Sequence, residues 1–332
     1  MRQIHPTNAL LWAASLLLAA ATFSCCTPKK STSTATDETP LTVPIFDADS
    51  AYAQVAAQVA FGPRVPGSEA HRACGDWLIS ELQRQGAVVS VQEAELKAYN
   101  GDILPSRNII GSYRTDTRRR VLLCAHWDSR PWADADPDPS LHHTPILGAN
   151  DGASGVGVLL EVARQLHQQT PAIGIDIAFF DSEDYGQHEE ETEYVPDSWC
   201  LGSQYWARQA RRNGYTARFG ILLDMVGAPD ARFCREGMSL NYAPGIVDKV
   251  WRTAHALGFG EYFPLSNGSY VTDDHLPVNQ TAKVPCIDII PYDEEYGFGQ
   301  HWHTVQDDLS WISPATLHAV GQTLLHVIYN EQ

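Results

Sequence analysis

The chain has 332 residues, of which 44% are hydrophobic and 19% charged, and its formal net charge is −17. This length suits one large domain or two small ones. Nucleic acid and anionic membrane surfaces are bound through basic patches, so a strongly acidic chain is unsuited to either partner. The composition favours a globular protein of enzyme size that acts on neutral or cationic molecules.

The first 24 residues have the features of an export signal. Arg2 stands ahead of the apolar run 9–21, and small residues follow that run. The apolar run is short for a transmembrane helix, which needs roughly 20 apolar residues. We therefore expect residues 1–24 to be a signal peptide that is removed on export.

The end of this segment resembles a bacterial lipoprotein signal. Ser24 precedes Cys25, which would become the lipidated N-terminus. Cleavage before Cys26 and a plain secretory signal are the alternatives. The resemblance implies an exported lipoprotein of the periplasm or cell envelope, attached to a bacterial membrane only through its lipid. Residues 25–46 are polar and rich in Pro and Thr, which predicts a flexible tether ahead of one catalytic domain at 47–332.

From residue 47 onward, helix-like and strand-like runs alternate. Apolar residues at helical spacing occupy the ranges 51–60, 69–86, 155–169, 201–214, 244–258 and 313–330. Strand-like runs occupy residues 87–96, 107–113, 119–129, 174–181, 217–227 and 283–291. This alternation predicts an α/β fold in which a mixed, mostly parallel central sheet has helices on both faces. The ligand site of such a sheet lies beyond the carboxyl ends of its strands.

The cysteines do not define a disulfide framework. Beyond Cys26 they are odd in number and contain no CxxC pair, so at most two bridges are compatible with the sequence. Cys124 and Cys286 lie inside strand-like runs. For these two, buried free thiols are the favoured interpretation.

The run ILGANDGASG, residues 146–155, holds one carboxylate, Asp151, on a glycine-rich turn before a helix-like run. A helix N-cap, a phosphate-binding loop and a metal ligand are the competing interpretations. The phosphate loop is excluded because the run lacks the GK[ST] ending and an acid there would repel an anion.

Acids and histidines follow several predicted strands. They are His126 and Asp128, Glu183 and Asp184, Asp224, the run 273–275, and His301 with His303. Each has an ordinary structural explanation by itself, but acids gathered at one sheet edge repel unless a cation neutralises them. Carboxylate and histidine ligands suit zinc, which takes three protein ligands at catalytic sites. Asp151, Asp184 and His303 form one such set, and Glu183 would lie beside the ion, able to transfer a proton.

Six segments occur in a characteristic order: HWDSRPW, GANDGASGVGVLLEVAR, FFDSEDYG, LLDMVGA, DDHLPV and WHTVQDD. In this order they resemble the zinc-dependent glutaminyl cyclases, which share the fold of the zinc aminopeptidases. The likeness extends over nearly all of the chain after the tether. It implies a glutaminyl-peptide cyclotransferase, which converts the N-terminal Gln of peptides and proteins to pyroglutamate and releases ammonia.

The resemblance also implies residue roles. Asp151, Asp184 and His303 match the ligands of a single zinc ion, although family members often have Glu at position 184. The shorter Asp then requires a closer backbone. Glu183 matches the general acid/base, and Asp224 and Asp273 match two acids hydrogen-bonded near the reacting amide. Trp302 matches a substrate-pocket tryptophan, and Trp132 or Trp199 would add a second aromatic wall.

A zinc aminopeptidase is the alternative on the same scaffold. It would use two metals, with His126 and Asp224 as additional ligands, and both residues are present. The tryptophan before His303, the DDH run and the HWDSRPW segment favour the cyclase. A non-catalytic binding protein is disfavoured because the candidate ligands and base are all present. The oligomeric state stays open.

Overall fold

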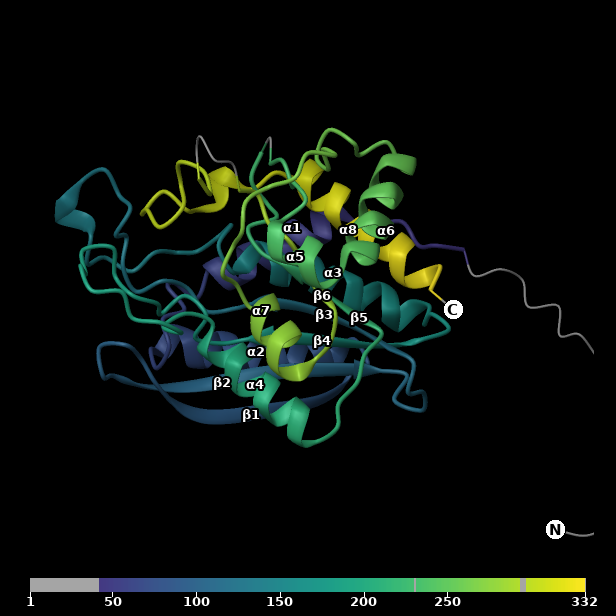
Figure 1. The fold of residues 1–332 in the computed structure, drawn as a ribbon, viewed down its shortest axis with the longest axis horizontal. Coiled ribbons are helices and arrows are strands. Elements are labelled where there is room, and N and C mark those ends of the chain that lie inside the picture. Colours follow the sequence, from purple (N-terminus) through teal and green to yellow (C-terminus); the bar gives the residue numbers. More distant parts are fainter. Residues whose placement is uncertain (1–41, 230, 293–296, 332) are drawn as a thin grey trace, which may run out of the picture. The chain divides into compact units, whose positions relative to one another are not determined.

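The computed structural model describes residues 42–229, 231–292 and 297–331 (Figure 1). Residues 41–332 form one compact unit, and the other unit, residues 1–40, lies outside the described residues. The α-helices are α1 (Ala48–Val59), α2 (Glu69–Arg84), α3 (Ala153–Gln168), α4 (Leu201–Arg212), α5 (Gly237–Tyr242), α6 (Pro244–Ala256), α7 (His275–Pro277) and α8 (Pro314–Tyr329). The strands are β1 (Val88–Lys97), β2 (Ile103–Tyr113), β3 (Arg120–His126), β4 (Gly174–Phe180), β5 (Phe219–Leu223) and β6 (Cys286–Ile289).

The strands form one sheet in the order β1–β2–β4–β3–β5–β6. β1 and β2 form an antiparallel pair, and β2 pairs antiparallel with β4. The remaining pairs, β4 with β3, β3 with β5 and β5 with β6, are parallel. β4 is buried along its whole length, and its sequence is apolar except for Asp176 rather than alternating between apolar and polar residues. The predicted fold class is confirmed.

Two apolar cores lie on opposite faces of the sheet. On one face, side chains of α1, α2, α3, α6 and α8 pack against the sheet. There they meet Leu123 and Ile177 of the central strands. Neighbouring residues of the same strands, Leu122 and Ala178, point the other way and meet Trp206 of α4. Alternate side chains of a strand point to opposite faces, so the central strands are covered by helices on both sides.

The folded domain begins before the predicted boundary at residue 47. Phe46 is buried, its backbone N–H donates to Oε1 of Gln322 at 2.9 Å, and a Cβ added to Gly321 would lie 2.1 Å from the Phe46 ring. Asp47 then caps α1 by accepting the backbone N–H of Ser50 at 3.0 Å. The last residues of the predicted tether are therefore part of the packed domain.

The predicted signal peptide and lipidation site, Cys25, lie outside the described residues. Within the described ranges, every helix is too short or too polar to cross a membrane. The cysteines of the described part of the chain are all free, and Cys124 and Cys286 are buried, as predicted.

Candidate metal centre and active site

The turn that carries Asp151 depends on two glycines. Gly148 and Gly152 have φ values of +57° and +91°, a region that L side chains rarely adopt. A Cβ on Gly152 would lie 2.5 Å from the carbonyl oxygen of Asp128. From the other side, the Asp307 carboxylate accepts the backbone N–H groups of Asn150 and Asp151 at 2.7 and 3.0 Å. The turn is thus fixed by a close contact and by two hydrogen bonds.

Asp151 is not the N-cap of α3, so the helix-cap interpretation is wrong. The cap position is occupied by Gly152, and no side chain caps the helix. The Asp151 carboxylate is buried and points instead toward His126 and His303. It is therefore available as a ligand.

The structure brings Asp151, Asp184 and His303 together at the carboxyl end of the sheet. Nε2 of His303 lies 3.2 Å from Oδ1 of Asp184 and 3.7 Å from Oδ2 of Asp151. Potential ligand atoms of all three lie within 4.8 Å of one another, and Oδ2 of Asp184 is buried without a hydrogen-bond partner. Two buried carboxylates at this separation need neutralising charge. The donor set fits a divalent cation, and its mixture of ligand types suits zinc.

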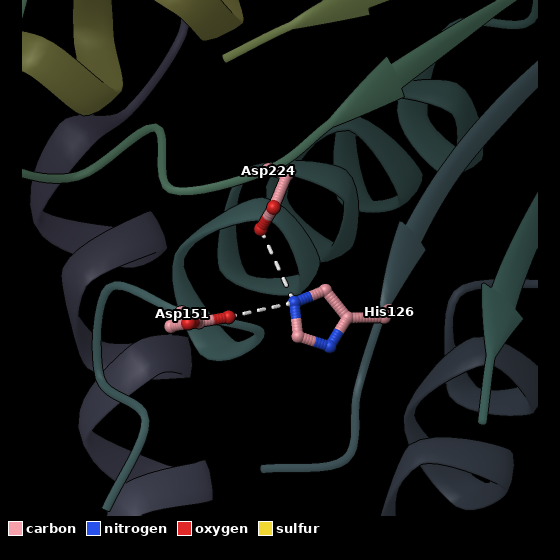
Figure 2. Close-up of side chains that lie close together, drawn as sticks. All are labelled: His126, Asp151 and Asp224. Carbon is pink, nitrogen blue, oxygen red and sulfur yellow. Dashed lines mark hydrogen bonds and ion pairs between the residues drawn. The ribbon is translucent and has the colours of Figure 1, made fainter. Parts of the chain in front are cut away.

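A second group of three shares Asp151 (Figure 2). Nε2 of His126, at the end of β3, lies 3.0 Å from Oδ1 of Asp151 and 3.1 Å from Oδ1 of Asp224. Asp224 follows β5, so the two carboxylates reach the same ring nitrogen from different elements. Burial opposes a charge on His126, but Asp224, Asp128 and Asp151 raise its pKa well above the ordinary value. This group can hold a second ion, or a proton on Nε2 can join the two carboxylates.

Glu183 lies beside the first group but points to a separate cluster. One of its carboxylate oxygens lies within 4.8 Å of Asp273, and Cys200 Sγ donates to Glu183 Oε1 at 3.2 Å. Burial raises the pKa of Glu183 well above its ordinary value, and the negative charge of Asp273 raises it further. Burial also raises the pKa of Asp224 to about 7. Carboxyl groups with raised pKa values hold their protons to higher pH than ordinary acids, which suits an acid/base site.

Apart from the buried His126, the candidate ligands and acids line one cavity of about 300 Å³. Trp302 stacks on the His303 ring at 3.7 Å, and Trp199 lies parallel to that ring at 6.0 Å. Trp132 does not line the cavity; it packs against Tyr185 outside it. Of the two residues proposed for a second aromatic wall, Trp199 therefore has the required position.

Two residues that the sequence marked only weakly hold the site together. Asp128 accepts the backbone N–H groups of Glu183 and Asp184 at 3.1 and 3.2 Å. Asp307, in the WHTVQDD segment, holds the Asp151 turn as described above. Both residues lie next to candidate ligands in the sequence. The backbone groups that they bind, however, lie between 55 residues (Asp128 to Glu183) and 157 residues (Asp307 to Asn150) away along the chain.

The DDH run divides between two environments. Asp273 lines the cavity, whereas His275 lies behind it, with Nε2 3.3 Å from Oε2 of Glu236. Glu236 caps α5 by accepting the backbone N–H groups of Met238 and Ser239. The segment therefore connects the cavity, through Asp273, to the buried pair of His275 and Glu236 behind the cavity wall.

Several non-glycine residues around this cavity have left-handed backbone. Ser182, Met225 and His303 have φ values of +54°, +50° and +52°. Such conformations cost energy and persist where surrounding contacts enforce them, often at functional sites. They lie next to Glu183, Asp224 and the candidate metal ligands, in agreement with a site built for function.

A mixed, mostly parallel α/β sheet with acids and histidines gathered at its strand ends is a suitable frame for a metal-dependent enzyme. The chain belongs to peptidase family M28, whose profile matches residues 108–328. It is 55% identical to the glutaminyl cyclase of Bacteroides thetaiotaomicron, solved with N-acetylhistamine; the match covers 88% of this chain and 100% of that chain, with a TM-score of 0.86.

Two further similar proteins carry different names. A Zn-dependent exopeptidase from Parabacteroides distasonis is 57% identical, with 87% of this chain and 100% of that chain covered and a TM-score of 0.86. The glutaminyl-peptide cyclotransferase of Drosophila melanogaster is 25% identical over 277 residues, which are 76% of this chain and 73% of that protein.

Proposed function

We propose that the protein is a glutaminyl-peptide cyclotransferase, which converts the N-terminal Gln of peptides and proteins to pyroglutamate with release of ammonia. The observation that carries this proposal is the position of Glu183. Its buried carboxylate lies beside Asp273 in a cavity that also contains the candidate metal ligands and two tryptophans. The likeness to the Bacteroides thetaiotaomicron glutaminyl cyclase supports the same reaction.

We assign one zinc ion to Asp151, Asp184 and His303. Three protein ligands leave a coordination position for substrate, as catalytic zinc sites do. When bound, zinc would polarise the γ-carbonyl group of the substrate Gln and stabilise negative charge on its oxygen.

Glu183 is the proposed general acid/base. The reaction forms a bond between the α-amine nitrogen and the γ-amide carbon and breaks the bond between that carbon and the amide nitrogen. Glu183 takes a proton from the amine and returns a proton to the departing nitrogen, so ammonia leaves and the carboxylate is regenerated. Asp224 and Asp273 exchange protons with Glu183, and the three interacting carboxyl groups titrate as a unit.

The cavity walls are proposed to fold the substrate. Because the amine and the amide belong to the same residue, the enzyme mainly has to hold the Gln side chain against its own N-terminus. Trp302 and Trp199 each lie nearly parallel to the His303 ring, and both line the cavity, where they offer flat apolar surfaces for the Gln methylenes. A small cavity of this kind suits a single side chain bent back on itself.

The sequence of residues 1–46 supports a proposal about location. We assign residues 1–24 to an export signal and Cys25 to lipid attachment, which would anchor the enzyme to a bacterial membrane in the periplasm or cell envelope. The mass of the N-terminal peptide of the mature protein tests this. A diacylglycerol-modified Cys25 is expected, and an unmodified N-terminus at another residue would contradict it.

One observation favours an aminopeptidase as the second candidate. His126, Asp151 and Asp224 form a complete second group of ligands that shares Asp151 with the first (Figure 2). Two ions on a shared carboxylate would activate water for peptide hydrolysis.

The products distinguish the two functions. The purified, zinc-loaded protein is incubated with a Gln-initiated peptide and with the same peptide initiated by Leu, and both are followed by mass spectrometry. Loss of ammonia from the Gln peptide, with the Leu peptide intact, is the expected result. Release of free leucine would move the assignment to an aminopeptidase.

A further inference from the structure

Arg130 is a fully buried cation next to the candidate metal site. Its Nε donates to Oδ1 of Asp134 at 2.7 Å, and a second nitrogen donates to the other oxygen of the same carboxylate. The remaining donors bind backbone: Nη1 donates to the carbonyl oxygen of Asp184 at 3.0 Å and Nη2 to that of Gln187 at 3.1 Å. A bidentate pair with its other donors satisfied is the arrangement in which a buried charge is tolerated.

This pair contacts two of the three candidate ligands. Nη1 of Arg130 lies 3.5 Å from Oδ1 of Asp184, in addition to its bond to the Asp184 carbonyl group. On the other side, Oδ1 of Asp134 lies 3.5 Å from Nδ1 of His303, opposite the nitrogen that faces the site. The backbone N–H of Ala135 also donates to the His303 carbonyl oxygen at 3.1 Å. Asp184 and His303, 119 residues apart in the sequence, are thus joined through one ion pair.

The same guanidinium supports the cavity wall. It lies over the Trp199 ring at 4.6 Å from the centroid, a cation–π contact, and Trp199 is parallel to the ring of His303. Asp134 additionally accepts the backbone N–H of Glu189 at 3.0 Å, so the pair also holds the loop that leads from Asp184 to Trp199.

We propose that Arg130 and Asp134 form a positioning pair that sets the metal affinity of the site. The pair orients His303, fixes the backbone of Asp184 and holds Trp199 against the cavity. It explains how an aspartate serves at position 184: Asp128 holds the N–H of Asp184 while Arg130 holds its carbonyl group, so both adjoining peptide units are fixed. This inference rests on the metal site assigned above and applies equally to a cyclase and an aminopeptidase.

A purely structural ion pair is the competing interpretation, and the chain contains a matched example. Arg120 and Asp176 form a bidentate pair at the opposite, amino-terminal end of β3 and β4, with Nε–Oδ2 and Nη2–Oδ1 distances of 2.6 and 2.7 Å. Both pairs stabilise the fold, but only the Arg130 pair touches candidate ligands. Lysine replaces either arginine with the charge kept and the bidentate fork lost.

The test compares Arg130→Lys with Arg120→Lys in the full-length protein. Zinc affinity is measured by competition with a chromophoric chelator, and thermal unfolding is followed with and without zinc. Arg130→Lys is expected to weaken zinc binding by about 10- to 100-fold, the usual effect of losing a group that orients a ligand. Arg120→Lys is expected to lower both melting temperatures and to leave the zinc affinity unchanged.

A folded Arg130→Lys protein with the zinc affinity of the wild type would overturn the inference. If that variant does not fold, Asp134→Asn keeps the side-chain shape, and the same loss of zinc affinity is expected from it; wild-type affinity would overturn the inference. Failure of the wild-type protein to bind zinc would instead remove the metal assignment on which the proposed function depends.

Discussion

The Nε2 atom of His126 lies 3.0 Å from Oδ1 of Asp151 (Figure 2). The other oxygen of Asp151 faces His303, so one carboxylate serves both possible metal positions. If a single ion binds beside His303, a proton on Nε2 of His126 can form hydrogen bonds with the carboxylates of Asp151 and Asp224. The number of ions bound therefore depends on whether His126 acts as a ligand.

We predict one tightly bound zinc per chain. His303→Ala should abolish this binding because it removes a ligand, whereas His126→Gln should keep it because Gln can still donate to the neighbouring carboxylates. Elemental analysis after exhaustive dialysis measures the stoichiometry. Two equivalents in the wild type, falling to one in His126→Gln, would support the two-metal alternative.

The glycine turn gives a second prediction. Gly152 and Gly62 both have φ of +91°, but a Cβ on Gly152 meets the Asp128 carbonyl oxygen at 2.5 Å, whereas a Cβ on Gly62 meets no atom within 4 Å. Gly62→Ala should cost about 1 kcal/mol of unfolding free energy from backbone strain alone. Gly152→Ala should cost more and weaken zinc binding, because the turn that carries Asp151 must move. Denaturant unfolding and zinc competition measure the two effects; equal behaviour of the variants would contradict this account.

The buried position of Glu183 predicts an unusual pH profile. The base form is active, so kcat/KM should rise with pH through the raised pKa of Glu183, well above the value of about 4.3 for an ordinary glutamate. The charge of Asp273 helps to raise that pKa. In Asp273→Asn the acidic limb should therefore move to lower pH, alongside a fall in rate. A limb that stays in place would show that Asp273 does not act on Glu183 through its charge.

Glu236 predicts a loss of stability in acid. Burial opposes its charge, but His275 and the backbone N–H donors of Met238 and Ser239 lower its pKa to about 2. This lowered pKa contributes stability that is fully present above the unfolded-state pKa of about 4.3 and is lost as pH falls toward 2. Glu236→Gln should lower the unfolding free energy at pH 6 by about 1–3 kcal/mol and reduce its difference between pH 6 and pH 3. The exposed Glu261→Gln is the control, and an equal pH dependence in all three proteins would contradict the prediction.

Much of the fold follows from local sequence pattern. Mainly apolar runs such as 174–181 predict buried strands, and strand ends predict where acids and histidines meet. The sequence could not show that Asp151 is free of the helix cap, because that depends on φ at Gly152 and on the distant Asp307. Local pattern also does not indicate that Phe46 packs in the domain, because its partner Gln322 lies 276 residues away.

The supporting residues were the hardest to predict. Arg130 and Asp134 lie in the HWDSRPWAD segment, but their contacts with Asp184 and His303 depend on how separate loops meet above the sheet. Trp132 and Trp199 were equivalent candidates for the cavity wall, and only the chain path after Asp184 distinguishes them. Local pattern indicates which residues gather at the site, whereas their orientation comes from long-range contacts.

The role of Glu183 as general acid/base is tested most directly by the rate of ammonia release from a Gln-initiated peptide by the wild type and by Glu183→Gln. Glu191→Gln, in an exposed part of the loop that follows, is the matched control. We expect Glu183→Gln to bind zinc normally but to lose at least about 100-fold in kcat, while Glu191→Gln retains the wild-type rate. Undiminished ammonia release by a folded, zinc-loaded Glu183→Gln protein would contradict the assignment of Glu183 as the general acid/base.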